Sequence, residues 1–206
     1  MDALAVLPES VVSGRRKPLH ATLAARLKAA RLAAGMDRAP LSAAAGLSHG
    51  VVASIEVQGR IPSIDTVEKI ARALQLSPCF LAYGVEGALL PPLGPDEALR
   101  AAGAGGRLQQ LRDHQALSLR GLAEAAQLSA TAVMNLEARK VLPSVATAEA
   151  LAVALGCSPC WLAYAEGPDP IADPQGAAAE LQAVKFRPPR SPRKPPAQRR
   201  RRVRSS

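Results

Sequence analysis

The chain has 206 residues and a formal net charge of +9, a length that allows one or two small domains. Aromatic residues make up only 2% of it, which argues against proteins that stack bases of single-stranded nucleic acid. No stretch is long and apolar enough for a membrane helix or a signal-peptide core. We therefore expect a soluble cytoplasmic protein, and three cysteines, an odd number, agree with a reducing compartment.

The positive charge is concentrated at the end of the chain. From Leu181 onward there are ten basic residues and no acidic one, whereas residues 1–184 carry 16 basic and 17 acidic residues, a net charge of −1. The basicity is therefore a property of the tail. We expect the tail to attract phosphates without sequence preference, with a merely solvating role as the alternative.

The chain repeats itself with a period of 81 residues. Residues 26–84 align without a gap with residues 107–165, and about 23 of the 59 pairs are identical. Each copy is long enough to bury its own core, which predicts one small fold made twice. The expected segments are a flexible N-terminus (1–19), a first domain (20–84), a Pro-rich linker (85–102), a second domain (103–167) and a disordered, basic Pro/Arg-rich tail (168–206).

Each copy has the cap and turn residues that delimit five short helices, and it has no strand pattern, which predicts an all-α protein. The helices are expected at about 20–34, 38–45, 48–57, 63–74 and 77–83, and in the second copy at 104–114, 119–126, 129–138, 144–155 and 158–164. Ser and Asp residues precede them as N-caps, and Pro78 and Pro159 stand at first helical positions. Ser48 and Ser129 are the expected caps of the two third helices.

The second and third helices of each copy are separated by only two residues, Gly46-Leu47 and Gln127-Leu128. Helices joined so tightly must cross steeply, which is the helix-turn-helix geometry that projects one helix into a DNA major groove. Here the sequence resembles the lambda repressor-like (Cro or Xre) family, through residues 41–56 and 122–137. The resemblance implies two tandem five-helix lambda repressor-like DNA-binding domains.

The family resemblance also implies which residues contact double-stranded DNA. The base-facing positions match His49, Gly50 and Ser54 in the first unit and Ala130, Thr131 and Asn135 in the second, beside the caps Ser48 and Ser129. The phosphate-contacting positions match Arg38, Gln58, Arg60, Arg120, Arg139 and Lys140. The pairs Arg31–Glu56 and Arg112–Glu137 resemble ion pairs that tie the first helix to the end of the third, and we expect side-chain contact in both.

The sequence departs from the family pattern in the turn and on the base-reading face. Gln127 stands where the family favours Gly, so it must adopt a backbone conformation that Gly adopts more cheaply. The base-reading positions lack Arg and Gln, the side chains of many strong bidentate contacts. Asn135 fits adenine and His49 a guanine acceptor, whereas Gly50 and Ala130 offer only closeness or a methyl contact.

No other chemistry is indicated. Cys157 and Cys160 have the spacing of a zinc or redox motif, but the first copy has only Cys79 at the corresponding place, which favours packing residues. The three histidines are scattered, and no catalytic constellation, cofactor motif or metal site is visible. We do not expect an enzyme.

These observations predict a transcriptional regulator that binds double-stranded DNA sequence-specifically through two helix-turn-helix units in one chain, associated with the nucleoid. One chain should then suffice for two half-sites, which differ because their reading residues differ. The alternative is a protein-interaction module, antitoxin-like or adaptor, with only nonspecific DNA affinity. A homodimer or a protein partner also remains open.

Overall fold

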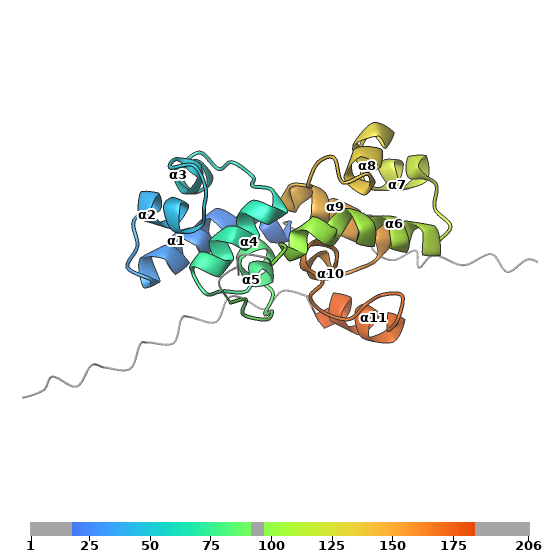
Figure 1. Ribbon diagram of the computed structural model, residues 1–206. Helices are drawn as coiled ribbons and strands as arrows, with labels where there is room; N and C mark the ends of the chain where they lie inside the picture. Colours follow the sequence, from blue (N-terminus) through green and yellow to red (C-terminus); the bar gives the residue numbers. More distant parts are fainter. Residues whose placement is uncertain (1–17, 92–96, 184–206) are drawn as a thin grey trace, which may run out of the picture.

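The computed structural model describes residues 18–91 and 97–183, and it confirms the all-α prediction (Figure 1). Within these residues the only strand-like feature is one antiparallel bridge, between Ser63 and Ser144. The first unit contains the 3-10 helix η1 (Leu19–Thr22), α1 (Leu23–Ala33), α2 (Arg38–Ala44), α3 (Val51–Glu56), α4 (Ile64–Ala73) and α5 (Pro78–Tyr83). The second contains η2 (Arg100–Gly103), α6 (Ala104–His114), α7 (Leu119–Ala125), α8 (Ala130–Glu137), α9 (Val145–Leu155) and α10 (Pro159–Tyr164), followed by α11 (Pro174–Ala183).

Serine side chains cap most helices of the second unit. Ser118, Ser129 and Ser144 accept hydrogen bonds from the backbone N–H groups of Gly121, Ala132 and Thr147, respectively, at the starts of α7, α8 and α9. These bonds satisfy N–H groups that have no partner within the helix. In the first unit neither Asp37 nor Ser63 makes such a bond, although each occupies the N-cap position.

The predicted start of the third helix in the first unit is wrong. α3 begins at Val51, with Gly50 at its N-cap position, so Ser48 does not cap it. His49 and Gly50 instead form a turn, in which the Val51 N–H donates to the Ser48 carbonyl (3.0 Å). The second unit has Ala130 and Thr131 at these positions, and α8 starts at Ala130 as expected. Gly is among the least favourable helix residues, which explains the shorter α3.

The prediction of disorder from residue 168 onward is also wrong for residues 174–183. These residues form α11, which buries Ala177 and whose Glu180 accepts a hydrogen bond from Ser158, the N-cap of α10 (2.9 Å). The linker is likewise partly anchored, since Leu90 and Ala101 are buried. The predicted flexible start (1–17), the middle of the linker (92–96) and the basic tail (184–206) lie outside the described residues.

The two units pack against each other through equivalent residues. The Ile64 N–H donates to the Pro143 carbonyl and the Val145 N–H to the Pro62 carbonyl, each at 3.0 Å. Positions 62 and 64 correspond to 143 and 145 in the repeat. A contact in which residue i of one unit meets j of the other, and j meets i, is the mark of a two-fold interface. The repeat is therefore folded as a two-fold pair within one chain.

Buried tyrosines follow the same two-fold relation. The Tyr83 hydroxyl donates to the Val145 carbonyl (3.2 Å), and the Tyr164 hydroxyl donates to the Ile64 carbonyl (3.4 Å). Both side chains are almost fully buried, and burial raises the pKa of both phenols. Each tyrosine thus reaches across to the first residue of the other unit's fourth helix, where α4 and α9 meet.

Two buried glutamates cap the 3-10 helices of the opposite units. Glu149 on α9 accepts hydrogen bonds from the backbone N–H groups of Leu19 (2.7 Å) and His20 (3.2 Å). Its counterpart Glu68 on α4 does the same for Arg100 (3.0 Å) and Ala101 (2.8 Å). A carboxylate at a helix N-terminus is favoured both by free N–H donors and by the helix dipole. These contacts fix the orientation of the two units.

A disulfide joins Cys79 on α5 to Cys160 on α10, with Cα atoms 5.3 Å apart. The two cysteines are equivalent in the repeat, so the bond links the two units at their two-fold interface. The expectation that they serve only as packing residues is therefore wrong. Cys157, the other half of the suspected motif, is a free and buried thiol whose pKa burial raises to about 12. A pairing that depends on two units meeting has no local sequence signature.

Figure 1 shows the result of these contacts. α4, α5, α9 and α10 form the centre of the molecule, while α1 to α3 and α6 to α8 extend to either side. α3 and α8 lie on the same side of the molecule, one in each unit, and α11 lies on the opposite side beside α10. One hydrophobic cluster contains the core of the first unit together with interface residues of the second, and a separate cluster forms the rest of the second unit's core.

Candidate nucleic-acid interface

The turn between the second and third helices has the same backbone form in both units. Gly46 (φ 64°) and Gln127 (φ 56°) occupy the left-handed region at equivalent positions. Gln127 thus adopts the conformation expected from the sequence, at a cost that Gly46 avoids. The turn brings the paired helices together, so that Leu41 and Val52 are buried in the same hydrophobic cluster in the first unit, as Leu122 and Val133 are in the second.

The third helices bury one face and leave the other to solvent. In α3 the buried residues are Val52 and Ile55, and in α8 they are Val133 and Leu136, which are the i and i+3 positions of one face. Seven of the predicted DNA-facing positions lie on the opposite side or just before the helix. Ser48, His49, Gly50, Ser129, Ala130 and Thr131 are exposed, whereas Ser54 is half-buried.

Ser54 and Asn135, two of the predicted base-reading residues, differ in whether their side chains already form hydrogen bonds within the protein. The Ser54 hydroxyl donates a hydrogen bond to the Val51 carbonyl of its own helix (2.8 Å), which occupies its hydrogen atom. Asn135 on α8 is half-buried and has no side-chain hydrogen bond to another described residue. The amide of Asn135 therefore keeps both its donor and its acceptor for a ligand.

Some of the predicted phosphate-contacting residues already pair with a carboxylate, and others do not. Arg38 lies next to Glu56 (2.8 Å), and Arg120 pairs with Glu124 one turn along α7 (3.1 Å). Arg60, which follows α3, and Lys140, which follows α8, are exposed and form no ion pair with any described residue. The loops after the third helices thus carry the cations that remain free for phosphates.

The ion pairs at the ends of the third helices are present in both units. Arg31 donates to the two carboxylate oxygens of Glu56 through Nε (2.7 Å) and Nη2 (3.0 Å), and Arg112 donates to Glu137 in the same way at 2.7 and 2.9 Å. The same arginines donate to the Met36 and Leu117 carbonyls, respectively, and so also brace the loop after the first helix. A planar guanidinium held by a carboxylate in two places fixes geometry as well as charge.

Glu56 has two arginine partners, whereas its counterpart in the second unit, Glu137, has one. Its side chain is fully buried and accepts hydrogen bonds from both Arg31 and Arg38. Burial disfavours the charged carboxylate, but the two guanidinium groups outweigh this effect and lower the pKa of Glu56, while Glu56 raises the pKa of Arg31. In the second unit Leu119 stands in place of Arg38, so Glu137 has one arginine only.

Sequence reasoning missed a close helix approach in the second unit. A Cβ atom at Gly105 on α6 would lie 2.3 Å from the Leu136 carbonyl of α8, so only glycine permits this approach. The neighbouring Gly106 faces the Arg139 guanidinium, from which a Cβ would be 2.8 Å away. The three glycines Gly103, Gly105 and Gly106 at the start of a helix are the sequence signal that could have predicted this close approach. Because Gly105 and Gly106 have no side chains, the Arg139 side chain can lie against α6.

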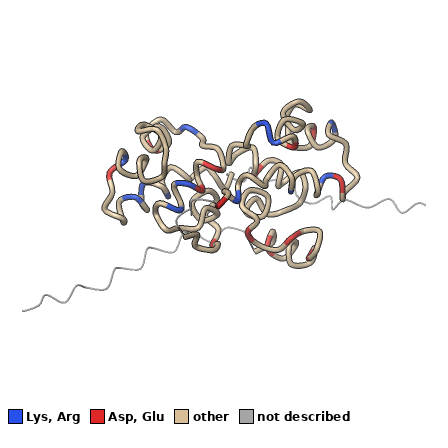
Figure 2. The backbone as a smooth tube through the Cα atoms, in the orientation of Figure 1, with Lys and Arg blue, Asp and Glu red and all other residues tan. Residues whose placement is uncertain are grey.

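Figure 2 shows where the charges lie. A basic stretch marks each of the loops that follow α3 and α8, on the side of the molecule that carries these two helices. Acidic residues are spread over the molecule, including its centre, where Glu68 and Glu149 cap the opposite units, and the region of α11 on the side away from α3 and α8. The solvent-facing side of α3 and α8 therefore combines a helix in each unit with a cation beside it, an arrangement suited to phosphate contact.

Other kinds of site are not found in the described part of the chain. Residues 18–91 and 97–183 contain no group of three or more His, Cys, Asp or Glu side chains arranged to hold a metal ion. No helix in these residues is sufficiently long and apolar to span a membrane.

Comparison with known proteins agrees with this geometry. A family model described as "Helix-turn-helix" matches residues 27–81, and one described as "Helix-turn-helix domain" matches residues 104–163. No curated protein matches the chain. The solved structure of the clp gene regulator ClgR from Corynebacterium glutamicum is 27% identical over 43% of this chain and 85% of that chain, with a TM-score of 0.30. The chain belongs to the lambda repressor-like, or Xre-type, helix-turn-helix transcriptional regulators and carries two DNA-binding domains of this type.

Proposed function

We propose that one chain binds double-stranded DNA sequence-specifically at two half-sites, with α3 reading one and α8 the other. The observation that carries this proposal is the two-fold interface within the chain, which puts both helices on one side of the molecule. Proteins of this kind commonly dimerise to present two recognition helices one helical turn of DNA apart. Here the second domain takes the place of a second subunit. Such a protein acts where chromosomal DNA lies, in the cytoplasm and on the nucleoid.

The two half-sites should differ in sequence. In the first unit the exposed positions carry His49 and Gly50 in a turn before a short α3, whereas α8 begins with Ala130 and Thr131. Asn135 has a free amide that can make paired hydrogen bonds to adenine in the major groove. His49 can meet a guanine acceptor, and the small residues permit close approach or contact with a thymine methyl group. The preferred site is therefore an imperfect palindrome.

The residues predicted to contact phosphate have different roles in this proposal. Arg60, Arg139 and Lys140, with Gln58, lie in the loops after the third helices and set position and salt dependence. Arg38 and Arg120 already have carboxylate partners, so their contribution to DNA affinity should be smaller.

The proposal is tested by selecting binding sites from a random duplex library and measuring the stoichiometry of the complex. We expect one chain per duplex, with footprints of two unlike half-sites about one helical turn apart. Asn135→Ala should relax base preference in one half-site only, and His49→Ala in the other only. The exposed control Ala25→Ser on α1 should change neither. A perfect palindrome protected only by two chains would contradict the proposal.

A second candidate function is a protein-interaction module derived from the same fold. It is favoured by α8, where the small Ala130 and the exposed apolar Met134, 47% accessible, give a surface with few groups for base recognition. If Thr131→Ala and Asn135→Ala together leave DNA affinity and site preference unchanged but abolish binding of a copurifying protein, the second unit is an interaction module. Loss of preference in one half-site would instead support DNA reading.

A further inference from the structure

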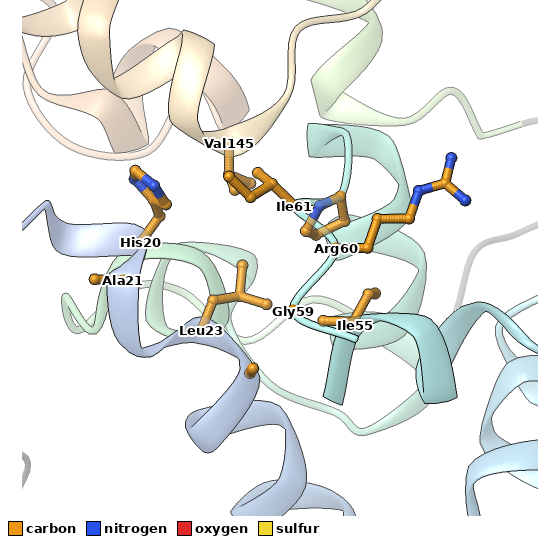
Figure 3. A pocket seen from close by; sticks show the side chains of 10 residues that line it. His20, Ala21, Leu23, Ile55, Gly59, Arg60, Ile61 and Val145 are labelled. Carbon is orange, nitrogen blue, oxygen red and sulfur yellow. The ribbon is translucent and has the colours of Figure 1, made fainter. Parts of the chain in front are cut away.

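The first unit contains a cavity of about 240 Å³ between the start of α1, the end of α3 and the start of α9 (Figure 3). Figure 3 shows His20 and Arg60 at opposite ends of this cavity, with the aliphatic side chains of Leu23, Ile61 and Val145 between them and the Arg60 guanidinium directed away from the cavity. Val145 belongs to the second unit, so the cavity touches the two-fold interface as well as the loop that follows α3. It therefore adjoins the elements that position the first recognition helix.

The cavity lies where the two copies differ in sequence. At Gly105 in the second unit, the absence of a Cβ lets the Leu136 carbonyl approach α6, and the Arg139 side chain lies beside the same glycine. The first unit has Ala24 at the position of Gly105 and Ile55 at that of Leu136, so its Cβ atom must hold α3 further from α1. Both Ala24 and Ile55 line the cavity. The cavity of the first unit thus lies where α1 carries a methyl group in place of the hydrogen atom of Gly105.

The size and lining of the cavity define what it can hold. An apolar protein cavity of about 150 Å³ is sufficient for benzene, so this one accommodates a single ring with a small substituent. Its walls are mostly aliphatic, and the ring of His20 is fixed by a hydrogen bond between its Nδ1 and Glu149 (2.6 Å). At the other end Arg60 is exposed and forms no ion pair with any residue in the described ranges. Because this exposed side chain is not held by an ion pair, it can turn toward the mouth of the cavity and pair there with an anionic head group.

We propose that this cavity is an effector site for a small apolar carboxylate, such as a single-ring aromatic acid, and that Arg60 turns toward the bound ligand and pairs with its carboxylate. Together with the proposed function, in which Arg60 contacts a DNA phosphate, this makes the ligand a competitor for that contact. The ligand also presses on Ile55 at the end of α3. Binding of the ligand should therefore lower the affinity for the first half-site while leaving the affinity for the second half-site unchanged.

The site is tested first without DNA, with benzoate as the probe and benzylamine as the cationic counterpart of similar shape. Benzoate should shift the methyl NMR signals of Leu23, Ile55 and Val145 saturably, with a Kd on the order of 1 mM, and benzylamine should not. Ala24→Leu should fill the cavity and abolish the shifts, whereas Ala25→Leu, on the exposed side of α1, should preserve them. Equal shifts with benzylamine, or benzoate shifts that persist in Ala24→Leu, would overturn the proposal.

A second variant covers the case in which Ala24→Leu does not fold. Arg60→Gln changes an exposed side chain, and it should remove the preference for benzoate over benzylamine without removing the cavity. In the presence of DNA, saturating benzoate should lower the salt slope of binding by about one, relative to the same concentration of sodium chloride. Benzoate shifts in free protein that leave this slope unchanged retain the pocket but refute its role as an effector site. Absence of the shifts refutes the pocket and leaves the proposed DNA function intact.

Discussion

At the scale of single residues, the two copies differ in the side chains that form equivalent ion pairs and equivalent left-handed turns. Glu56 is fully buried between two arginines, whereas Glu137 has one and is slightly more accessible. Gly35 and Gly46 adopt left-handed backbone where the second unit has Ala116 (φ 52°) and Gln127 (φ 56°). The first unit therefore has the more extensive ion cluster, whereas the second has more non-glycine residues at positive φ, although the first has one at Gln75 (φ 54°).

Neutralising the buried glutamates should have unequal effects. Glu56→Gln leaves two arginines without a counter-charge and should lower the free energy of unfolding by about 3 kcal/mol, with a smaller loss for Glu137→Gln. Because the folded pKa of Glu56 is lowered, its stabilisation is present above the ordinary pKa of 4.5 and is lost as the pH falls below it. Urea denaturation at pH 7 and at pH 3 measures both effects. Equal losses for the two variants at pH 7 would contradict this account.

Relieving the backbone strain should stabilise the second unit. Ala116→Gly and Gln127→Gly should each raise the free energy of unfolding by up to about 1 kcal/mol, since glycine adopts positive φ without steric cost. The matched control Gly46→Ala, at φ 64°, should lower it. Thermal unfolding of the three variants decides the matter, and a destabilised Gln127→Gly would show that the side chain of Gln127 outweighs its backbone.

At the scale of helices, the sequence predicted the existence and type of all ten repeated elements. Cap residues and short turns carry this information locally, as with Ser129 and the start of α8. The start of α3 was missed because Ser48 is followed by His49 and Gly50, and the weak helix propensity of glycine outweighs the cap. α11 was missed because its few apolar residues are stabilised by contact with α10, which no local pattern encodes.

Replacing the glycine should lengthen the first recognition helix. Gly50 has φ −93°, and a Cβ atom at this position would meet no other atom within 4 Å, so Ala fits there without strain. Gly50→Ala should extend α3 toward Ser48 and stabilise the protein by about 0.5–1 kcal/mol. Amide exchange at Val51 and Val52 should slow accordingly. Unchanged exchange at these amides would mean that contacts of His49, and not glycine, hold the turn open.

At the scale of the whole molecule, the two units form one structure in which residues of both units share the hydrophobic cluster at their interface. The sequence alone did not predict this packing, although the identical islands around Pro62, Cys79 and Tyr83 all map to the interface. Within a single domain, those identities indicate only a repeated fold. Residues that meet their own equivalents across a two-fold axis are constrained in both copies. This constraint is a second cause of the sequence identity, and it can be recognised only once the structure is known.

The disulfide should contribute to stability without being required for the arrangement. It closes a loop of 81 residues, so the double variant Cys79→Ser and Cys160→Ser should lose about 4 kcal/mol under oxidising conditions. Wild type treated with reductant should match the variant, and both should keep their footprint because the glutamate caps and the Ser63–Ser144 bridge remain. Thiol titration and chemical denaturation test the first point. A lost half-site in the variant would show that the covalent link is needed.

The basic tail should act on affinity and not on preference. Deleting residues 185–206 removes ten positive charges, and it should flatten the salt dependence of DNA binding while sparing the selected sequence. Binding isotherms at several salt concentrations, for the preferred and a scrambled duplex, measure both quantities. A selective loss for the preferred duplex would assign sequence readout to the tail.

The fusion of both halves into one polypeptide has an evolutionary consequence. In a pair of identical subunits, every substitution in a reading residue is copied to the partner, so operators must drift symmetrically. Here a change at His49 leaves Ala130 untouched, because the two codons are separate. Under the proposed function, each unit can therefore change its base preference independently, while the interface between the units keeps α3 and α8 on one side of the molecule.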